Sequence, residues 1–96
     1  MLDQTSLNTL KQIVRKYLPD QAYKTFVFGS RVNGSNRKFS DIDLGVKGLK
    51  ELSAKEYIMI KNEFDDSDLP YRVDLIDFAN VSDKFKQMSL SNIINL

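Results

Sequence analysis

The apolar residues of the chain follow a helical period near the N-terminus and a strand period soon after it. Between residues 7 and 18 they recur every three or four positions, which predicts an amphipathic helix that Thr5 or Ser6 caps and Pro19 ends. The residues on its apolar face are Leu7, Leu10, Ile13, Val14, Tyr17 and Leu18. Residues 24–28 are then rich in aromatic and β-branched side chains, which predicts a first strand.

A strict alternation of polar and apolar side chains over residues 41–46 predicts a second strand, which Gly48 closes. Ser53 and Glu56 have the spacing of a capping box, so a second helix is expected to begin near Ala54. The residues that this helix is expected to bury are Tyr57, Ile60 and Phe64. Its acidic C-terminal end is expected to be solvated and to hold no calcium, because it lacks the spacing of an EF-hand loop.

Residues 71–77 predict a third strand, and Ser82 opens a last helix. The apolar face of that helix is expected to use Phe85, Met88 and Ile93 or Ile94. The order α-β-β-α-β-α predicts an α/β (α+β) fold, with a small three-stranded mixed sheet and helices packed on one side. Residues 1–96 are expected to form a single domain.

Composition narrows the chemistry that is available to the chain. Its net charge is only +1, so no global field marks a nucleic-acid binder, and a phosphate ligand needs a local site. With 0 cysteines and 0 histidines, thiol and imidazole chemistry and zinc thiolate sites are excluded, while Mg²⁺ with oxygen ligands stays available. The N-terminus lacks the pattern of a signal peptide and no apolar run suggests a membrane span, so a soluble, cytoplasmic protein is expected.

Asp41 and Asp43 are the first candidates for a site. They stand two apart on one strand, so both side chains leave the same face and can converge on a divalent cation. If the second and third strands are neighbours, Asp74 can join them and receive the proton of an attacking hydroxyl. Two alternatives are open: the paired acids are merely solvated at a strand end, or Asp74 is an edge-strand acid paired with Arg72.

Gly29 and Ser30 end the first strand, and antiparallel pairing would place them beside Asp41 and Asp43. Glycine permits close backbone approach and serine offers a hydroxyl and an amide to a phosphate oxygen. Arg31 adds a cation suited to phosphate. A plain turn followed by a solvated basic loop is the alternative. Asp77 falls on the opposite face of its strand and is expected to be a strand-end or turn residue.

In combination, "GSRVNGSNRKFSDIDL" and "SDLPYRVDLIDFA" resemble the polymerase β-type nucleotidyltransferase superfamily, and within it the minimal nucleotidyltransferases (MNT proteins) that pair with HEPN-domain proteins. The resemblance covers nearly the whole chain and implies a minimal polymerase β-like fold. It implies that Asp41, Asp43 and Asp74 are catalytic and hold Mg²⁺. It implies nucleotide and phosphate contacts at Gly29, Ser30, Arg31 and Ser40.

The activity that this resemblance implies is transfer of AMP from ATP to a hydroxyl of a HEPN-domain toxin, tyrosine being the expected acceptor. The chain would then be an antitoxin that works as a protein adenylyltransferase. Two other functions stay open: an antitoxin that neutralises its partner by binding alone, and an aminoglycoside-type nucleotidyltransferase. The expected partners are ATP and a HEPN protein in a hetero-oligomer, with a homodimer possible and with no direct nucleic-acid or membrane contact.

Overall fold

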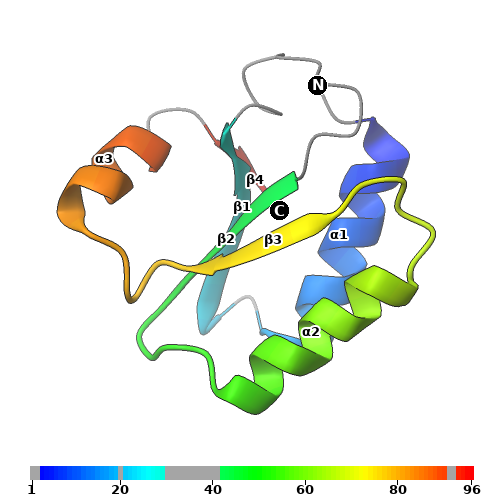
Figure 1. The fold of residues 1–96 in the computed structure, drawn as a ribbon, viewed down its shortest axis with the longest axis horizontal. Helices are drawn as coiled ribbons and strands as arrows, with labels where there is room; N and C mark the ends of the chain where they lie inside the picture. The colour runs from blue at the N-terminus through cyan, green and yellow to red at the C-terminus, as the bar shows by residue number, and fades with distance from the viewer. Residues whose placement is uncertain (1–2, 20, 30–41, 91–92) are drawn as a thin grey trace.

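The computed structural model of the protein describes residues 3–19, 21–29, 42–90 and 93–96 (Figure 1). In chain order the elements are α1 (Gln4–Tyr17), β1 (Tyr23–Phe28), β2 (Ile42–Gly48), α2 (Ala54–Asp66), β3 (Val73–Asp77), α3 (Asp83–Leu90) and β4 (Ile94–Asn95). The sheet has the strand order β3-β2-β1-β4. Strand β1 runs antiparallel to β2 and β4, whereas β2 and β3 are parallel. The mixed α+β class is confirmed, but the sheet has a fourth strand.

The fourth strand corrects the expectation for the C-terminus. The apolar face of the last helix was expected to use Ile93 or Ile94, but α3 ends at Leu90 and Ile94 lies in β4 opposite Val27. The amide of Leu96 extends this pairing by donating to the carbonyl of Thr25 at 3.0 Å. Consecutive β-branched residues favour an extended chain, and β1 has a free edge that this segment covers. The side chain of Met88, placed on the same helical face, lies outside the described part.

Helix α1 is capped two or three residues earlier than the sequence indicated. Its N-cap is Asp3, whose carboxylate accepts a hydrogen bond from the Ser6 amide, so Thr5 and Ser6 are not the caps. Hydrogen bonds from the Ser6 side chain, and to a smaller extent from the Ser6 amide, hold the pKa of Asp3 below its usual value. The helix ends at Tyr17, just before Pro19, as expected. Aspartate is as good an N-cap as serine, so the choice between neighbouring polar residues depends on where the first buried turn begins.

Helix α2 has the capping box that the sequence indicated. Ser53 Oγ accepts from the Glu56 amide, and the Glu56 carboxylate accepts from the Ser53 amide, both at 3.1 Å. Ile60 and Phe64 are buried, but Tyr57 is 38% exposed, so the expectation that Tyr57 is buried was wrong. A tyrosine can pack the apolar part of its ring against the protein and still leave its hydroxyl in water.

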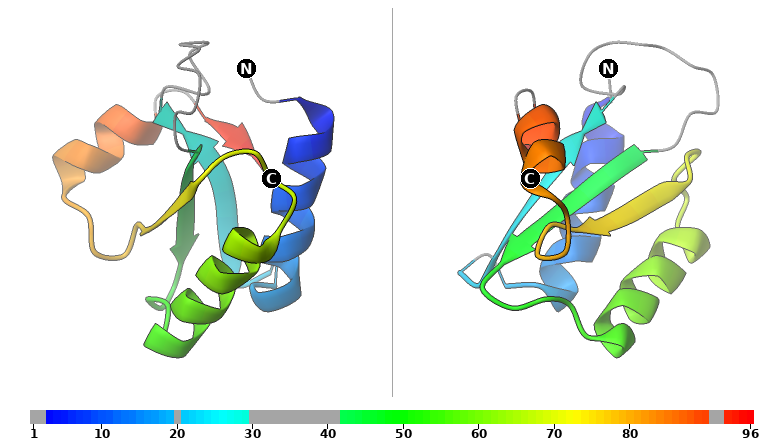
Figure 2. Two further views of the ribbon diagram at one scale, coloured as in Figure 1. Left: turned by 45° about the vertical axis from the view of Figure 1, so that its right-hand side comes forward. Right: turned by 60° about the vertical axis from the view of Figure 1, so that its left-hand side comes forward.

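The larger core lies between the sheet and helices α1 and α2, which cover one face together (Figure 2). It is formed by the buried residues Leu10, Ile13, Val14, Leu18, Val27, Ile42, Leu44, Val46, Ile60, Phe64, Val73 and Leu75. The expectation of helices on one side holds for these two helices. Helix α3 differs, because its Phe85 contacts an aromatic cluster that belongs to the opposite face.

This aromatic cluster consists of Phe26, Phe28 and Phe78, with Phe85 at its margin. Phe78 contacts Phe26 and Phe28 edge to face at centroid distances of 4.9 and 5.3 Å. Gly45 leaves room for it, because a Cβ there would lie within 2.8 Å of the Phe78 ring and overlap the Phe26 ring. On this second face the cluster covers β1 and Gly45 of β2, and Ile76 of β3 packs against it. Asp43 and Asp74 lie on the same face, nearer the beginning of β2 and β3.

Asp77 is the last residue of β3, and the prediction that it is a strand-end or turn residue is confirmed. Its carboxylate accepts from the amide of Leu52 at 2.7 Å and from that of Ala79 at 3.0 Å, which ties the entry of α2 to the end of β3. We expect Asp77→Ala to lower the free energy of unfolding by about 1–3 kcal/mol, because it leaves a part-buried amide without its acceptor. Urea denaturation measures this. The matched exposed variant Asp68→Ala should stay within about 0.5 kcal/mol of wild type, and equal losses would contradict this role.

None of the helices in the described part of the chain is long and apolar enough to cross a membrane.

Candidate active site

Strands β2 and β3 bring Asp43 and Asp74 side by side. They are partners in the parallel register, one step after the pair of Ile42 with Val73. Because paired residues of neighbouring strands project to the same face, both carboxylates leave the sheet on the side opposite α1 and α2, from strands about 4.8 Å apart. Both side chains are only partly buried, so solvent and ligands can reach them.

Gly29 lies directly against this pair. It follows Phe28, the cross-strand partner of Asp43, and its φ of +82° is a conformation that residues with a side chain rarely adopt. A Cβ at this position would stand 2.5 Å from Asp43 Oδ2. The glycine therefore lets the end of β1 turn and lets its backbone contact the carboxylate, as the antiparallel arrangement predicted.

Four of the seven residues predicted for the site lie outside the described part of the chain: Ser30, Arg31, Ser40 and Asp41. The three that are described, Gly29, Asp43 and Asp74, come together in space although they are far apart in sequence. The alternative pairing of Asp74 with Arg72 is absent, since no ion pair joins these two described residues. Among the described residues, which do not include Asp41, no three or more His, Cys, Asp or Glu side chains group where they could hold a metal ion.

The donors at this position suit a hard divalent cation. Two carboxylates on adjacent strands repel one another without a counter-charge, and like charges directly opposite destabilise a sheet. Oxygen donors are what Mg²⁺ prefers, and Asp43 and Asp74 can share one ion or hold part of a two-ion site. The backbone of Gly29 closes one side of the same space. The arrangement can therefore hold a metal ion next to a phosphate group.

One feature beside the carboxylates was not indicated by the sequence. Phe28 is the cross-strand partner of Asp43. Because Phe28 belongs to the aromatic cluster and contacts Phe85, the cluster and Phe85 border the candidate site. The alternation of Phe26 and Phe28 with Val27 assigns the two rings to one face, but it does not say that α3 contributes to that face. Only the tertiary contact between Phe85 and the two rings of Phe28 and Phe78 reveals it.

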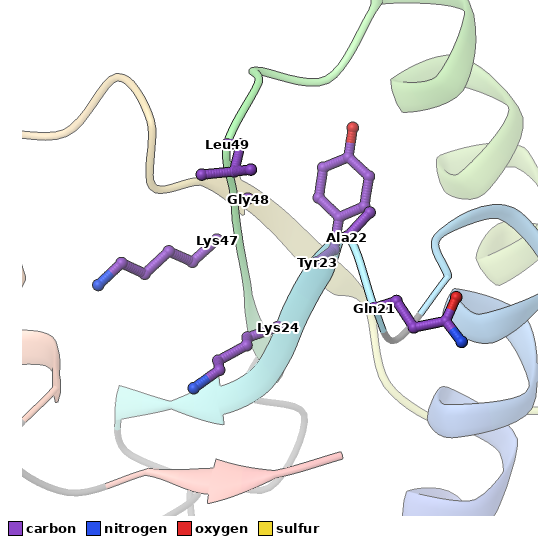
Figure 3. A pocket seen from close by; sticks show the side chains of 7 residues that line it. All are labelled: Gln21, Ala22, Tyr23, Lys24, Lys47, Gly48 and Leu49. Carbon is purple, nitrogen blue, oxygen red and sulfur yellow. The ribbon is translucent and has the colours of Figure 1, made fainter.

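A separate hollow lies at the other end of the pair β1–β2 (Figure 3). Its volume is about 300 Å³, and Lys24 and Lys47 reach from neighbouring strands to the same side of it. The lining residues are Gln21, Ala22, Tyr23, Lys24, Lys47, Gly48 and Leu49. Since it contains none of the predicted site residues, this hollow is distinct from the space at Gly29, Asp43 and Asp74.

Comparison with known proteins decides the family. Residues 8–95 match the family described as "Polymerase beta, Nucleotidyltransferase". The chain belongs to the polymerase beta nucleotidyltransferase family. Within this nucleotidyltransferase family it is 39% identical over 82 residues to the probable protein adenylyltransferase MntA of Haemophilus influenzae, a match that covers 85% of this chain and 70% of the relative.

Single chains in solved structures of toxin–antitoxin complexes have the same fold as this nucleotidyltransferase. A structure of the tri-AMPylated Shewanella oneidensis HEPN toxin in complex with MNT antitoxin matches with a TM-score of 0.73 and 21% identity, over 98% of this chain and 71% of the matched chain. A toxin–antitoxin structure with AMP-PNP matches with a TM-score of 0.74 and 22% identity, over 98% of this chain and 72% of the matched chain. The minimal polymerase β-like fold inferred from the sequence motifs is thus confirmed.

Proposed function

We propose that residues 1–96 form one nucleotidyltransferase domain that transfers AMP from ATP, with Mg²⁺, to a tyrosine hydroxyl of a HEPN-domain toxin and thereby acts as its antitoxin. The observation that carries this proposal is the contact of Gly29 with Asp43 beside Asp74. Two neighbouring carboxylates and a close backbone approach suit a metal-bound triphosphate. Asp41 would complete the metal site, and Ser30, Arg31 and Ser40 would contact the phosphates.

The reaction needs little covalent work from the protein. The acceptor oxygen forms a bond to the α-phosphorus, the bond between the α- and β-phosphates breaks, and pyrophosphate leaves. Asp74 would take the proton of the acceptor hydroxyl, since the chain has no histidine to do so. Asp43 would hold the divalent ion together with Asp41 and Asp74, and that ion would supply the Lewis-acid polarisation of the α-phosphate. Positioning and charge stabilisation therefore account for the catalysis.

The relatives support the acceptor and the donor in this proposal. The Haemophilus protein is a probable protein adenylyltransferase. The solved complexes contain an AMPylated HEPN toxin in one case and the ATP analogue AMP-PNP in another. A contact-only antitoxin would have no need for Asp43 and Asp74 to share one face of the sheet, because like charges there destabilise it.

The test measures intact mass after incubation of the purified protein with ATP, Mg²⁺ and the proposed HEPN-domain partner. We expect mass to be added to the HEPN protein in units of AMP, with pyrophosphate released in equal amount. EDTA should prevent both. A stable complex without added mass would instead support the contact-only antitoxin. Transfer of AMP to an aminoglycoside but not to the HEPN protein would support the small-molecule enzyme.

A further inference from the structure

Phe85 stands out among the aromatic residues because a large part of its ring is uncovered. Phe26, Phe28 and Phe78 are at most 6% exposed, whereas Phe85 is 39% exposed. Its ring still contacts the cluster, at centroid distances of 6.1 Å to Phe28 and 5.8 Å to Phe78. Helix α3 thus holds an aromatic ring in a fixed position at the margin of an apolar surface and leaves part of that ring open.

This surface continues directly from the candidate active site. Phe28 pairs with Asp43 across β1 and β2, so both side chains leave the same face of the sheet, and Gly29 follows Phe28 in the chain. Helix α3 lies on that face, near the end of β1 (Figure 2). On the other side of the carboxylates, β3 is the edge strand of the described sheet. Among the described residues, the apolar surface beside Asp43 and Asp74 is therefore the aromatic cluster with Phe85.

We infer that the open part of the Phe85 ring stacks on the nucleobase of the bound nucleoside triphosphate, an assignment that rests on the proposed function. The base is tethered through the ribose to the α-phosphate, so it must lie a short distance to one side of Asp43 and Asp74. The base has an apolar π-face. The apolar surface that borders the site is the aromatic cluster on β1, together with Phe85 of α3. Stacking tolerates every base, so Phe85 would strengthen nucleotide binding without selecting adenine by hydrogen bonds.

The test separates base binding from phosphate binding in the full chain. With Mg²⁺ present, we expect Phe85→Ala to weaken binding of AMP-PNP about tenfold or more, from the loss of one stacked base. Binding of inorganic tripolyphosphate should change less than about twofold, because it has no base. Phe85→Tyr keeps a π-face and should bind both probes like wild type. Phe85→Leu keeps an apolar contact with Phe28 and Phe78 but has no π-face, so it should lose AMP-PNP selectively.

Three results would overturn this assignment. Equal losses for AMP-PNP and tripolyphosphate in Phe85→Ala would show a structural role only. Unchanged binding of both probes would show that the ring does not touch the nucleotide. A raised KM for the HEPN protein with an unchanged KM for ATP would assign the ring to the acceptor. A wild-type protein that binds AMP-PNP through Phe85 but transfers no AMP would contradict the proposed function and leave the base contact intact.

Discussion

The Asp43→Asn protein should transfer AMP to the HEPN partner at least about 10³-fold more slowly than wild type. A divalent ion contributes several kcal/mol of charge stabilisation in the transition state, and each 1.4 kcal/mol, roughly, corresponds to a factor of ten in rate. The neutral amide is a poorer ligand for Mg²⁺, and it stands where Gly29 contacts the carboxylate. Initial rates with α-labelled ATP at saturating Mg²⁺ measure the loss. The exposed variant Asp66→Asn, at the end of α2, should retain the full rate.

Thermal unfolding provides an independent test of the same metal site. In EDTA we expect Asp74→Asn to raise the Tm by about 1–5 °C, because it removes a like charge directly beside Asp43. Adding Mg²⁺ should raise the Tm of wild type and of Asp66→Asn, since a ligand that binds the folded state stabilises it. It should not raise the Tm of Asp43→Asn. Equal stabilisation of all these proteins by Mg²⁺ would place the ion elsewhere.

The sheet and the core of the site follow from patterns that are local in sequence. Strict alternation over residues 42–46 places Asp43 on the face of the sheet that α1 and α2 do not cover. The same period in β3 places Asp74 and Asp77 on opposite faces. A period of two leaves no freedom in the face that each side chain takes once one face is buried. For this reason the face that Asp43 and Asp74 take could be predicted, whereas their meeting with Gly29 depended on the strand pairings that the sequence analysis assumed and that the structure has.

Other features depend on contacts that no local pattern encodes. Strand β4 has only the residues Ile94 and Asn95, and it exists because β1 offers an edge. The sequence places Phe85 on the apolar face of a helix, but it does not say what that face packs against. In the structure Phe85 contacts Phe78, which lies in the turn after β3. Several polar residues near the start of α1 can serve as its cap, and Asp3 does so. For β4 and for Phe85 a distant segment makes the choice, whereas the cap is chosen by where the first buried turn of α1 begins.

Gly29→Ala is expected to impair both the fold and the reaction, and the combination distinguishes a site glycine from a structural one. At φ +82° a side chain costs about 1–2 kcal/mol. The added methyl would also stand 2.5 Å from Asp43 Oδ2, so the carboxylate or the end of β1 must shift. A displacement of about 1 Å at a reacting centre can slow a reaction by about 10²-fold, which is the loss that we expect in the rate of AMP transfer.

The matched control is Gly48→Ala, at the other end of the same pair of strands. Its Cβ would overlap the ring of Tyr23 and lie 3.0 Å from the carbonyl of Ala22, far from the carboxylates along β2. Urea denaturation should show a loss of stability in both variants. The rate of AMP transfer per folded molecule should fall in Gly29→Ala and stay within about twofold of wild type in Gly48→Ala. Equal rates in the two variants would mean that the close approach of Gly29 to Asp43 serves the turn alone.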